Sequence, residues 1–136
     1  MYLLDANVIS HIAKNPAGPA AQRIAEEPRE LICTSVVVSA EVLFGFANGT
    51  SADIRRKMTG VLEGMRVIGM EQPVDKFYAS IRAALKKGGL AIGPNDMFIA
   101  AHALALEATL VTADRGFRFV PDLKLENWLR SETAAD

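Results

Sequence analysis

Short apolar runs alternate along the chain with longer stretches in which apolar residues recur every three or four positions. The short runs have the length of buried strands, and the longer stretches have the period of helices. Five strands are predicted: Tyr2 to Asp5, Leu31 to Thr34, Arg66 to Met70, Thr109 to Thr112 and Lys124 to Glu126. Strands separated by helices in this way predict an α/β fold of three layers, with a short central parallel sheet of about five strands flanked by helices.

Capping residues and proline or glycine breaks mark the ends of the predicted helices. Asp5 or Asn7 is a suitable cap for the first helix, which runs to about residue 14, and Ser35 is a suitable cap for the third. The helices after the first are predicted at residues 19–27, 35–49, 51–64, 73–89 and 93–106. The longest begins at Pro73 and has an apolar face. That face consists of Phe77, Ile81, Ala84 and Leu85.

The composition is that of one globular domain. Of the 136 residues, 50% are hydrophobic and 23% are charged, which supplies a full core and leaves little room for a second domain. We expect one domain over residues 1–130, a flexible polar tail over residues 131–136, and Cys33 as a small core residue. The N-terminus lacks the pattern of a signal peptide, and no apolar run reaches the roughly 18 residues that cross a bilayer. We therefore expect a soluble protein in the cytoplasm that does not bind membranes.

Four acidic residues lie in apolar surroundings, where a carboxylate without a partner is costly to bury. Asp5 ends the first predicted strand and Asp114 follows the fourth, so both lie at the carboxyl edge of the sheet, where open parallel sheets bind ligands. Asp96 is in the first turn of a helix. Glu41 is in the middle of a helix, on an apolar stripe that must face the core or a partner. Each acid alone has an ordinary explanation as a cap, a turn former or a surface residue, but one shared function explains all four.

A shared cation is the simplest such function, because four converging carboxylates otherwise repel one another and raise some of their pKa values. Oxygen ligands alone suit Mg²⁺ or Mn²⁺, and the sequence holds no histidine or cysteine pattern of a zinc site. The only histidines, His11 and His102, are interpreted as structural or interface residues and not as general bases. The predicted metal ligands and catalytic residues of this metal-dependent enzyme are Asp5, Glu41, Asp96 and Asp114.

Four polar residues beside these acids are predicted to support them: Asn7, Asn95, Thr112 and Arg115. Asn7 can orient a carboxylate or a metal-bound water. The Thr112 hydroxyl can donate a hydrogen bond to Asp5 or to a phosphate oxygen, and Asn95 can act in either way. Arg115 can hold a substrate phosphate, although a purely surface role fits the sequence as well.

The net charge of −1 does not exclude a nucleic-acid partner. Apart from the four unusual acids, basic residues outnumber acidic ones by three. A neutral protein can present a basic rim around an acidic centre, because the shape of the field steers a polyanion. The candidate rim segments are residues 55–57, Arg82 with residues 86–87, and Arg115 with Arg118.

Four segments, in this order and spacing, resemble the motifs of PIN-domain ribonucleases. They are residues 3–10 (LLDANVIS), 39–45 (SAEVLFG), 92–103 (IGPNDMFIAAHA) and 110–117 (LVTADRGF). The resemblance covers essentially the whole chain, down to residues 123–128 (LKLENW), and it is greatest to VapC-type toxins of bacterial toxin–antitoxin pairs. Any one motif is weak, but four at this spacing in a chain with no other domain are specific.

This resemblance implies a PIN-like fold and a Mg²⁺- or Mn²⁺-dependent endoribonuclease that cleaves RNA. It also implies a homodimer or a toxin–antitoxin hetero-oligomer, held inactive by a small VapB-type antitoxin. By motif position, Asn7 and Thr112 carry over as supporting residues, and the metal-binding and catalytic set carries over as Asp5, Glu41, Asp96 and Asp114. Relatives often have a further acid where this chain has Gly116, so a second metal is expected to be weakly held or absent until substrate arrives.

The expected reaction is hydrolysis of an RNA phosphodiester bond by metal-activated water, which Glu41 or Asp96 orients or deprotonates. Two alternatives remain open from the sequence. One is a housekeeping RNA-processing PIN nuclease, against which the lack of an accessory RNA-binding domain argues. The other is a catalytically silent PIN domain that binds RNA or protein, against which the complete acid set argues.

Overall fold

Five short parallel strands form the central sheet of the computed structural model, which describes residues 1–130. The tail predicted over residues 131–136 lies outside the described residues. The strands are β1 (Tyr2–Leu4), β2 (Ile32–Ser35), β3 (Arg66–Ile68), β4 (Thr109–Val111) and β5 (Leu125–Glu126). Their order across the sheet is β3-β2-β1-β4-β5, and every neighbouring pair is parallel. The predicted five-stranded parallel sheet is therefore confirmed.

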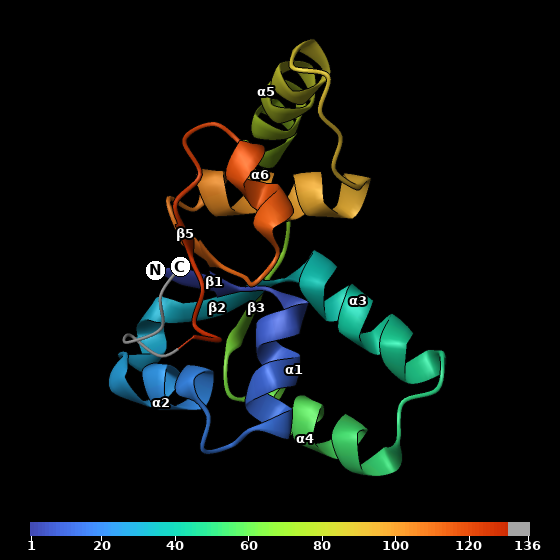
Figure 1. Ribbon diagram of the computed structural model, residues 1–136, viewed down its shortest axis with the longest axis vertical. Helices are drawn as coiled ribbons and strands as arrows, with labels where there is room; N and C mark the ends of the chain where they lie inside the picture. The colour runs from blue at the N-terminus through green and yellow to red at the C-terminus, as the bar shows by residue number, and fades with distance from the viewer. Residues whose placement is uncertain (131–136) are drawn as a thin grey trace.

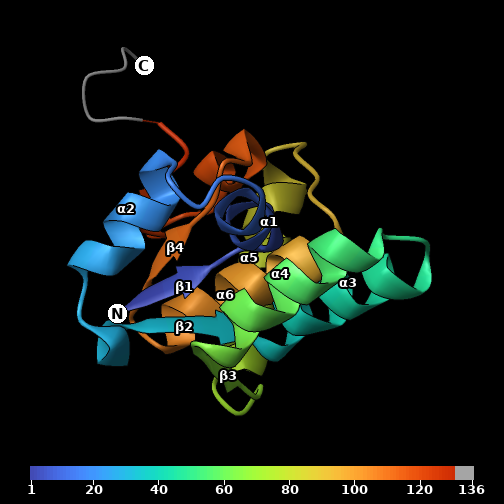
Figure 2. The same ribbon diagram turned by 90° about the horizontal axis from the view of Figure 1, so that it is seen from below.

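Helices cover both faces of this sheet. Within residues 1–130 they are α1 (Ala6–Lys14), α2 (Pro19–Glu26), α3 (Val36–Ala47), α4 (Ala52–Glu63), α5 (Val74–Lys87) and α6 (Pro94–Ala105), with 3₁₀ turns η1 (Arg29–Leu31) and η2 (Arg115–Phe119). Helices α1, α2 and α4 lie on one side of the sheet and α5 and α6 on the other, while α3 extends away from its edge (Figures 1 and 2). This is the predicted three-layer α/β architecture.

Side-chain caps fix where the helices next to the site begin. The Asp5 carboxylate accepts the Ala6 N–H at 2.8 Å, so Asp5 rather than Asn7 caps α1. Ser35 Oγ accepts the Val37 N–H at 3.1 Å and caps α3. Asp5 directly follows β1 and Ser35 is the last residue of β2, so the chain passes from strand to helix without a loop in both places.

Some predicted details are wrong. Leu31 is not in a strand, because its N–H bonds to Pro28 O and closes turn η1. The third strand ends at Ile68, not Met70, because its partner β2 ends at Ser35 where α3 begins. Ala84 is exposed, whereas Ile81 and Leu85 on the same helix are buried. A methyl group adds little to a face that longer side chains already fill.

The core lies on both sides of the two central strands. Its fully buried members include Leu3 and Leu4 of β1 and Leu110 and Val111 of β4. Helix α6 packs against them with small side chains, among them Ala100, Ala101 and Ala103, which let the helix lie close to the sheet. Cys33 is fully buried, as predicted. No helix within residues 1–130 combines the length and the apolar character needed to cross a membrane.

Candidate active site

Asp5 is the most enclosed of the four acids, with only 5% of its surface exposed. It stands between the end of β1 and the start of α1. Its Oδ2 accepts hydrogen bonds from Thr112 Oγ1 at 2.8 Å and from Asn7 Nδ2 at 3.2 Å. Burial raises the pKa of Asp5 and the charge of Asp114 raises it further, although these hydrogen bonds act in the opposite direction.

Thr112 and Asn7 join the end of β4 to the end of β1. Thr112 Oγ1 accepts the Asp114 N–H at 3.0 Å and is 3.2 Å from Asn7 Nδ2. Asn7 Oδ1 accepts the Ala113 N–H at 3.0 Å. The hydrogen bond predicted from Thr112 to Asp5 is present, and Asn7 lies where it orients the same carboxylate.

Glu41 reaches the edge from the middle of α3, where it is half-buried. Burial raises the pKa of Glu41, and the charges of Asp5 and Asp96 raise it further. A hydrogen bond from the Asn95 side chain lowers that pKa. Asn95 therefore favours the charged form of Glu41, and its supporting role stays a prediction.

Asp96 and Asp114 complete the acidic edge from two other elements. Asp96 is half-buried in the first turn of α6, and burial raises its pKa, followed by the charges of Asp5 and Asp114. Asp114 is exposed and caps turn η2, where its Oδ1 accepts the Gly116 N–H at 2.8 Å. Repulsion thus links all four carboxylates, which come from β1, α3, α6 and the end of β4.

The donor chemistry of this edge suits a hard divalent cation. The acids offer only oxygen atoms, and three of them have raised pKa values in part because like charges face each other. Within residues 1–130, no group of three or more Asp, Glu, His or Cys side chains is already arranged to hold a metal ion. The residues that could hold such an ion are Asp5, Glu41, Asp96 and Asp114.

His102 makes a contact near the acids that the sequence did not reveal. Its side chain is 1% exposed, and its Nδ1 is 2.8 Å from Ser35 Oγ. Burial lowers the pKa of His102, while a hydrogen bond to the backbone of Gly69 acts in the opposite direction. The structural interpretation of His102 is confirmed, and its buried position on α6 is consistent with the apolar pattern of residues 97–103.

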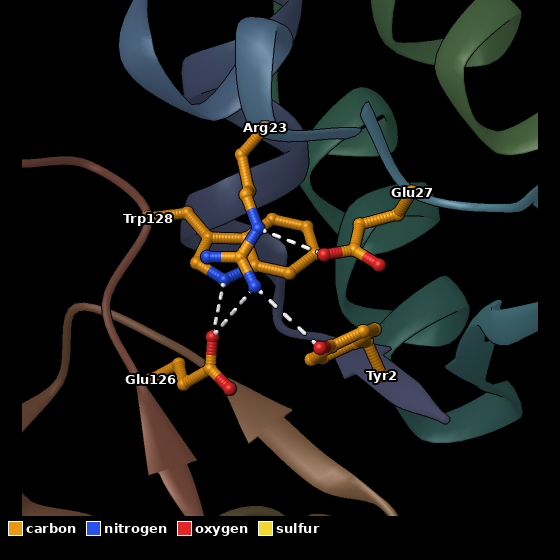
Figure 3. Close-up of polar contacts among 5 residues, drawn as sticks. All are labelled: Tyr2, Arg23, Glu27, Glu126 and Trp128. Atoms are coloured by element: carbon orange, nitrogen blue, oxygen red, sulfur yellow. Dashed lines mark hydrogen bonds and ion pairs between the residues drawn. The ribbon is translucent and has the colours of Figure 1, made fainter. Parts of the chain in front are cut away.

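A second group that the sequence did not reveal surrounds the Arg23 guanidinium of α2 (Figure 3). Arg23 is 3.0 Å from Glu27 Oε1 and 3.3 Å from Glu126 Oε1. It also lies over the rings of Trp128 and Tyr2, with 4.9 and 5.7 Å to the ring centroids. Only the i,i+4 spacing of Arg23 and Glu27 was a sequence signal, because the other partners come from the two ends of the chain.

The PIN domain family matches residues 2–123 of the chain, which include all four acids. The chain belongs to the PIN domain family. Ribonuclease VapC2 of Rickettsia felis is 32% identical over 131 residues, covering 94% of this chain and 98% of that protein. Ribonuclease VapC1 of Haemophilus influenzae is 30% identical over 133 residues, covering 96% and 99%.

Two solved structures share this PIN fold closely. One is VapBC2 from Rickettsia felis bound to a DNA fragment from the promoter, with a TM-score of 0.85, 29% identity, and 93% of this chain and 98% of that chain covered. The other is VapBC-1 from nontypeable Haemophilus influenzae, with a TM-score of 0.82, 30% identity, and 95% and 98% covered. The family expected from the four motifs is therefore confirmed.

Proposed function

We propose that this PIN protein is an endoribonuclease that acts as the toxin of a toxin–antitoxin pair in the cytoplasm. Its relatives at about 30% identity are named ribonucleases, and solved structures that resemble it are VapBC complexes. The observation that carries the proposal is the acidic edge, where four electrostatically linked carboxylates of different elements meet beside Thr112 and Asn7. We take residues 1–130 as one PIN domain that holds the whole site.

Asp5, Glu41, Asp96 and Asp114 would hold the divalent metal, which we propose to be Mg²⁺ or Mn²⁺. A bound ion of this kind lowers the pKa of a water molecule and offsets the charge of the scissile phosphate. Thr112 and Asn7 hold the Asp5 carboxylate in one orientation. Glu41 or Asp96 would orient the attacking water or take its proton.

RNA is the proposed substrate, and a VapB-type antitoxin is the proposed inhibitor. The solved relatives described above are complexes of toxin and antitoxin, which supports a hetero-oligomer for this chain, with a homodimer of the toxin as the other assembly. An antitoxin reading frame next to this one on the genome would separate a toxin from a housekeeping nuclease.

The test is RNA cleavage by the purified chain and by its Asp5→Asn and Asp96→Asn variants. Both variants should lose cleavage while they keep the fold, because Asn preserves the shape of each side chain and removes its charge. Asp53→Asn is the matched control, since Asp53 is an exposed acid on α4 that pairs with Arg56 and Lys57. Full cleavage by Asp5→Asn and Asp96→Asn at the same metal concentration would refute the assignment.

Thermal unfolding with and without Mn²⁺ tests the metal separately. A ligand that binds only the folded state raises the melting temperature. Mn²⁺ should therefore raise it for the unmodified chain and for Asp53→Asn, and less for Asp96→Asn. The absence of any shift in the unmodified chain would favour a silent PIN domain.

A further inference from the structure

A shallow hollow of about 210 Å³ adjoins the acidic edge. It lies between turn η2 and the end of β5, and its lining includes Asp114, Arg115, Arg118, Glu126 and Asn127. Asp114 belongs both to this hollow and to the acidic edge. A linear substrate that crosses the edge at Asp114 therefore enters the hollow next.

Arg118 is oriented before any ligand arrives. Its Nη1 donates a hydrogen bond to Arg115 O at 2.6 Å, and its guanidinium carbon is 4.1 Å from the centroid of the Phe119 ring. A planar guanidinium held by stacking and by one hydrogen bond loses less entropy when it binds an anion. Its other N–H groups are donors of the geometry that phosphate oxygens accept.

Glu126 is the second acid of the hollow, and its charge is balanced by Arg23, which does not line the hollow (Figure 3). Its Oε1 is 3.3 Å from Arg23 and accepts the Trp128 Nε1–H at 3.0 Å. The remaining acid, Asp114, belongs to the set proposed to hold the metal. Two arginines therefore set the charge that a ligand meets in the hollow.

We propose that this hollow binds the sugar–phosphate backbone of a single RNA strand beside the scissile bond, with Arg115 and Arg118 on a phosphate. Asn127 adds a further donor, because its Oδ1 accepts the Leu129 N–H at 3.0 Å and its Nδ2 group is the side of the amide that can donate to a ligand. Arg23 prevents Glu126 from repelling the strand. The inference rests on the ribonuclease function proposed above and specifies the path of the substrate.

The affinity of the protein for RNA tests this proposed binding site separately from cleavage. The assay is fluorescence anisotropy of a short labelled single-stranded RNA of mixed sequence, with the full chain carrying Asp96→Asn, in Mg²⁺ buffer at several salt concentrations. Adding Arg118→Ala should weaken binding by about fivefold or more, as expected for a charge-assisted hydrogen bond. It should also reduce the slope of log K against log salt by about 0.7, the value for one phosphate contact to a single strand.

Two further variants separate this contact from general charge effects. Arg118→Lys keeps the positive charge but lacks the planar set of N–H donors of a guanidinium. It should therefore restore the slope of log K against log salt but not the full affinity. Arg29→Ala removes an exposed arginine of turn η1, which precedes β2 and lies outside the candidate rim segments, and should change the affinity by less than about twofold.

A separate experiment tests whether Arg23 balances the charge of Glu126. Arg23→Ala should weaken RNA binding by about threefold at low salt, although Arg23 does not line the hollow, and the loss should shrink as salt screens the exposed charge. Adding Glu126→Gln to Arg23→Ala should restore the affinity, because the charge that Arg23 balanced is then gone. A purely structural role of Arg23 predicts no such restoration.

Unchanged RNA affinity in both Arg115→Ala and Arg118→Ala would overturn the hollow as a binding site. The ribonuclease assignment would survive that result, since it depends on the loss of cleavage in Asp96→Asn. Tighter binding of a labelled oligoglutamate than of the RNA, lost in Arg118→Ala, would assign the hollow to an acidic protein segment and would also overturn the proposal.

Discussion

His102 Nδ1 lies 2.8 Å from Ser35 Oγ in the interior of the protein, and this contact joins the helix of Asp96 to the cap of the helix of Glu41. Neither residue is one of the four acids. The contact nevertheless ties together the two helices that carry Glu41 and Asp96, and α3 and α6 are in contact with each other.

Removal of His102 should therefore affect both stability and activity. We expect His102→Ala to lower the free energy of unfolding by about 2–4 kcal/mol, because it leaves a cavity and removes one of the two partners of the buried Ser35 hydroxyl. Urea unfolding measures this change. RNA cleavage at a temperature at which the variant is fully folded should still be reduced. Normal cleavage there would show that the acids keep their places without the contact.

Asp96 should make the metal-free protein less stable as the pH rises. Its pKa in the folded state is raised above 3.8, so between these two values the folded state binds more protons than the unfolded state. The free energy of unfolding therefore falls as the pH rises through this window. Asp96→Asn should be more stable than the unmodified chain at neutral pH in a chelator and should lose this advantage below the window. Urea unfolding across acidic and neutral pH measures the difference, and equal stability at every pH would contradict it.

Thr112→Val should disturb the edge without changing its charge. The variant loses the 2.8 Å hydrogen bond to Asp5 and the acceptor of the Asp114 N–H. We expect a loss of about 1–3 kcal/mol in the free energy of unfolding and about tenfold slower cleavage. Thr112→Ser keeps the hydroxyl and is the matched control, which should cleave RNA at close to the normal rate.

Gly116 offers a test of the number of metals. A Cβ atom there would lie 3.1 Å from Asp114 Oδ1, so a side chain at this position enters the acidic edge directly. The exposed Asp114 side chain has room to adjust. Gly116→Asp should raise the number of Mn²⁺ ions bound per chain, measured by isothermal titration calorimetry. Gly116→Ala adds the same Cβ without a ligand and should leave that number unchanged.

The sequence was sufficient to predict the acidic edge because its signals are local. Asp5 and Asp114 each follow an apolar strand, and Asp96 follows a Gly–Pro helix start, so strand ends and helix starts together predict that they lie at one edge. Glu41 was detectable because a carboxylate in the middle of an apolar helix is unusual. The four motifs then indicated the family, which the comparisons confirm.

The contacts that the sequence did not reveal connect distant segments. Arg23 meets Glu126 and Trp128 only after β5 has paired with β4, and nothing near Arg23 in the sequence indicates these partners. The His102–Ser35 contact likewise spans 67 residues. Turn η1 was taken as strand at Leu31 because a short apolar run does not distinguish the two.

The pairing of β1 with β4 also determines when the acidic edge forms. Asp5 and Thr112 are separated by 107 residues, although their side chains are in contact. Contacts between such distant segments form late, because a long loop must close before they can form. A chain emerging from the ribosome therefore presents Asp5, Glu41 and Asp96 before β4 has arrived to complete their arrangement. The acidic edge is therefore complete only after residues 109–114 have been made and β4 has paired with β1.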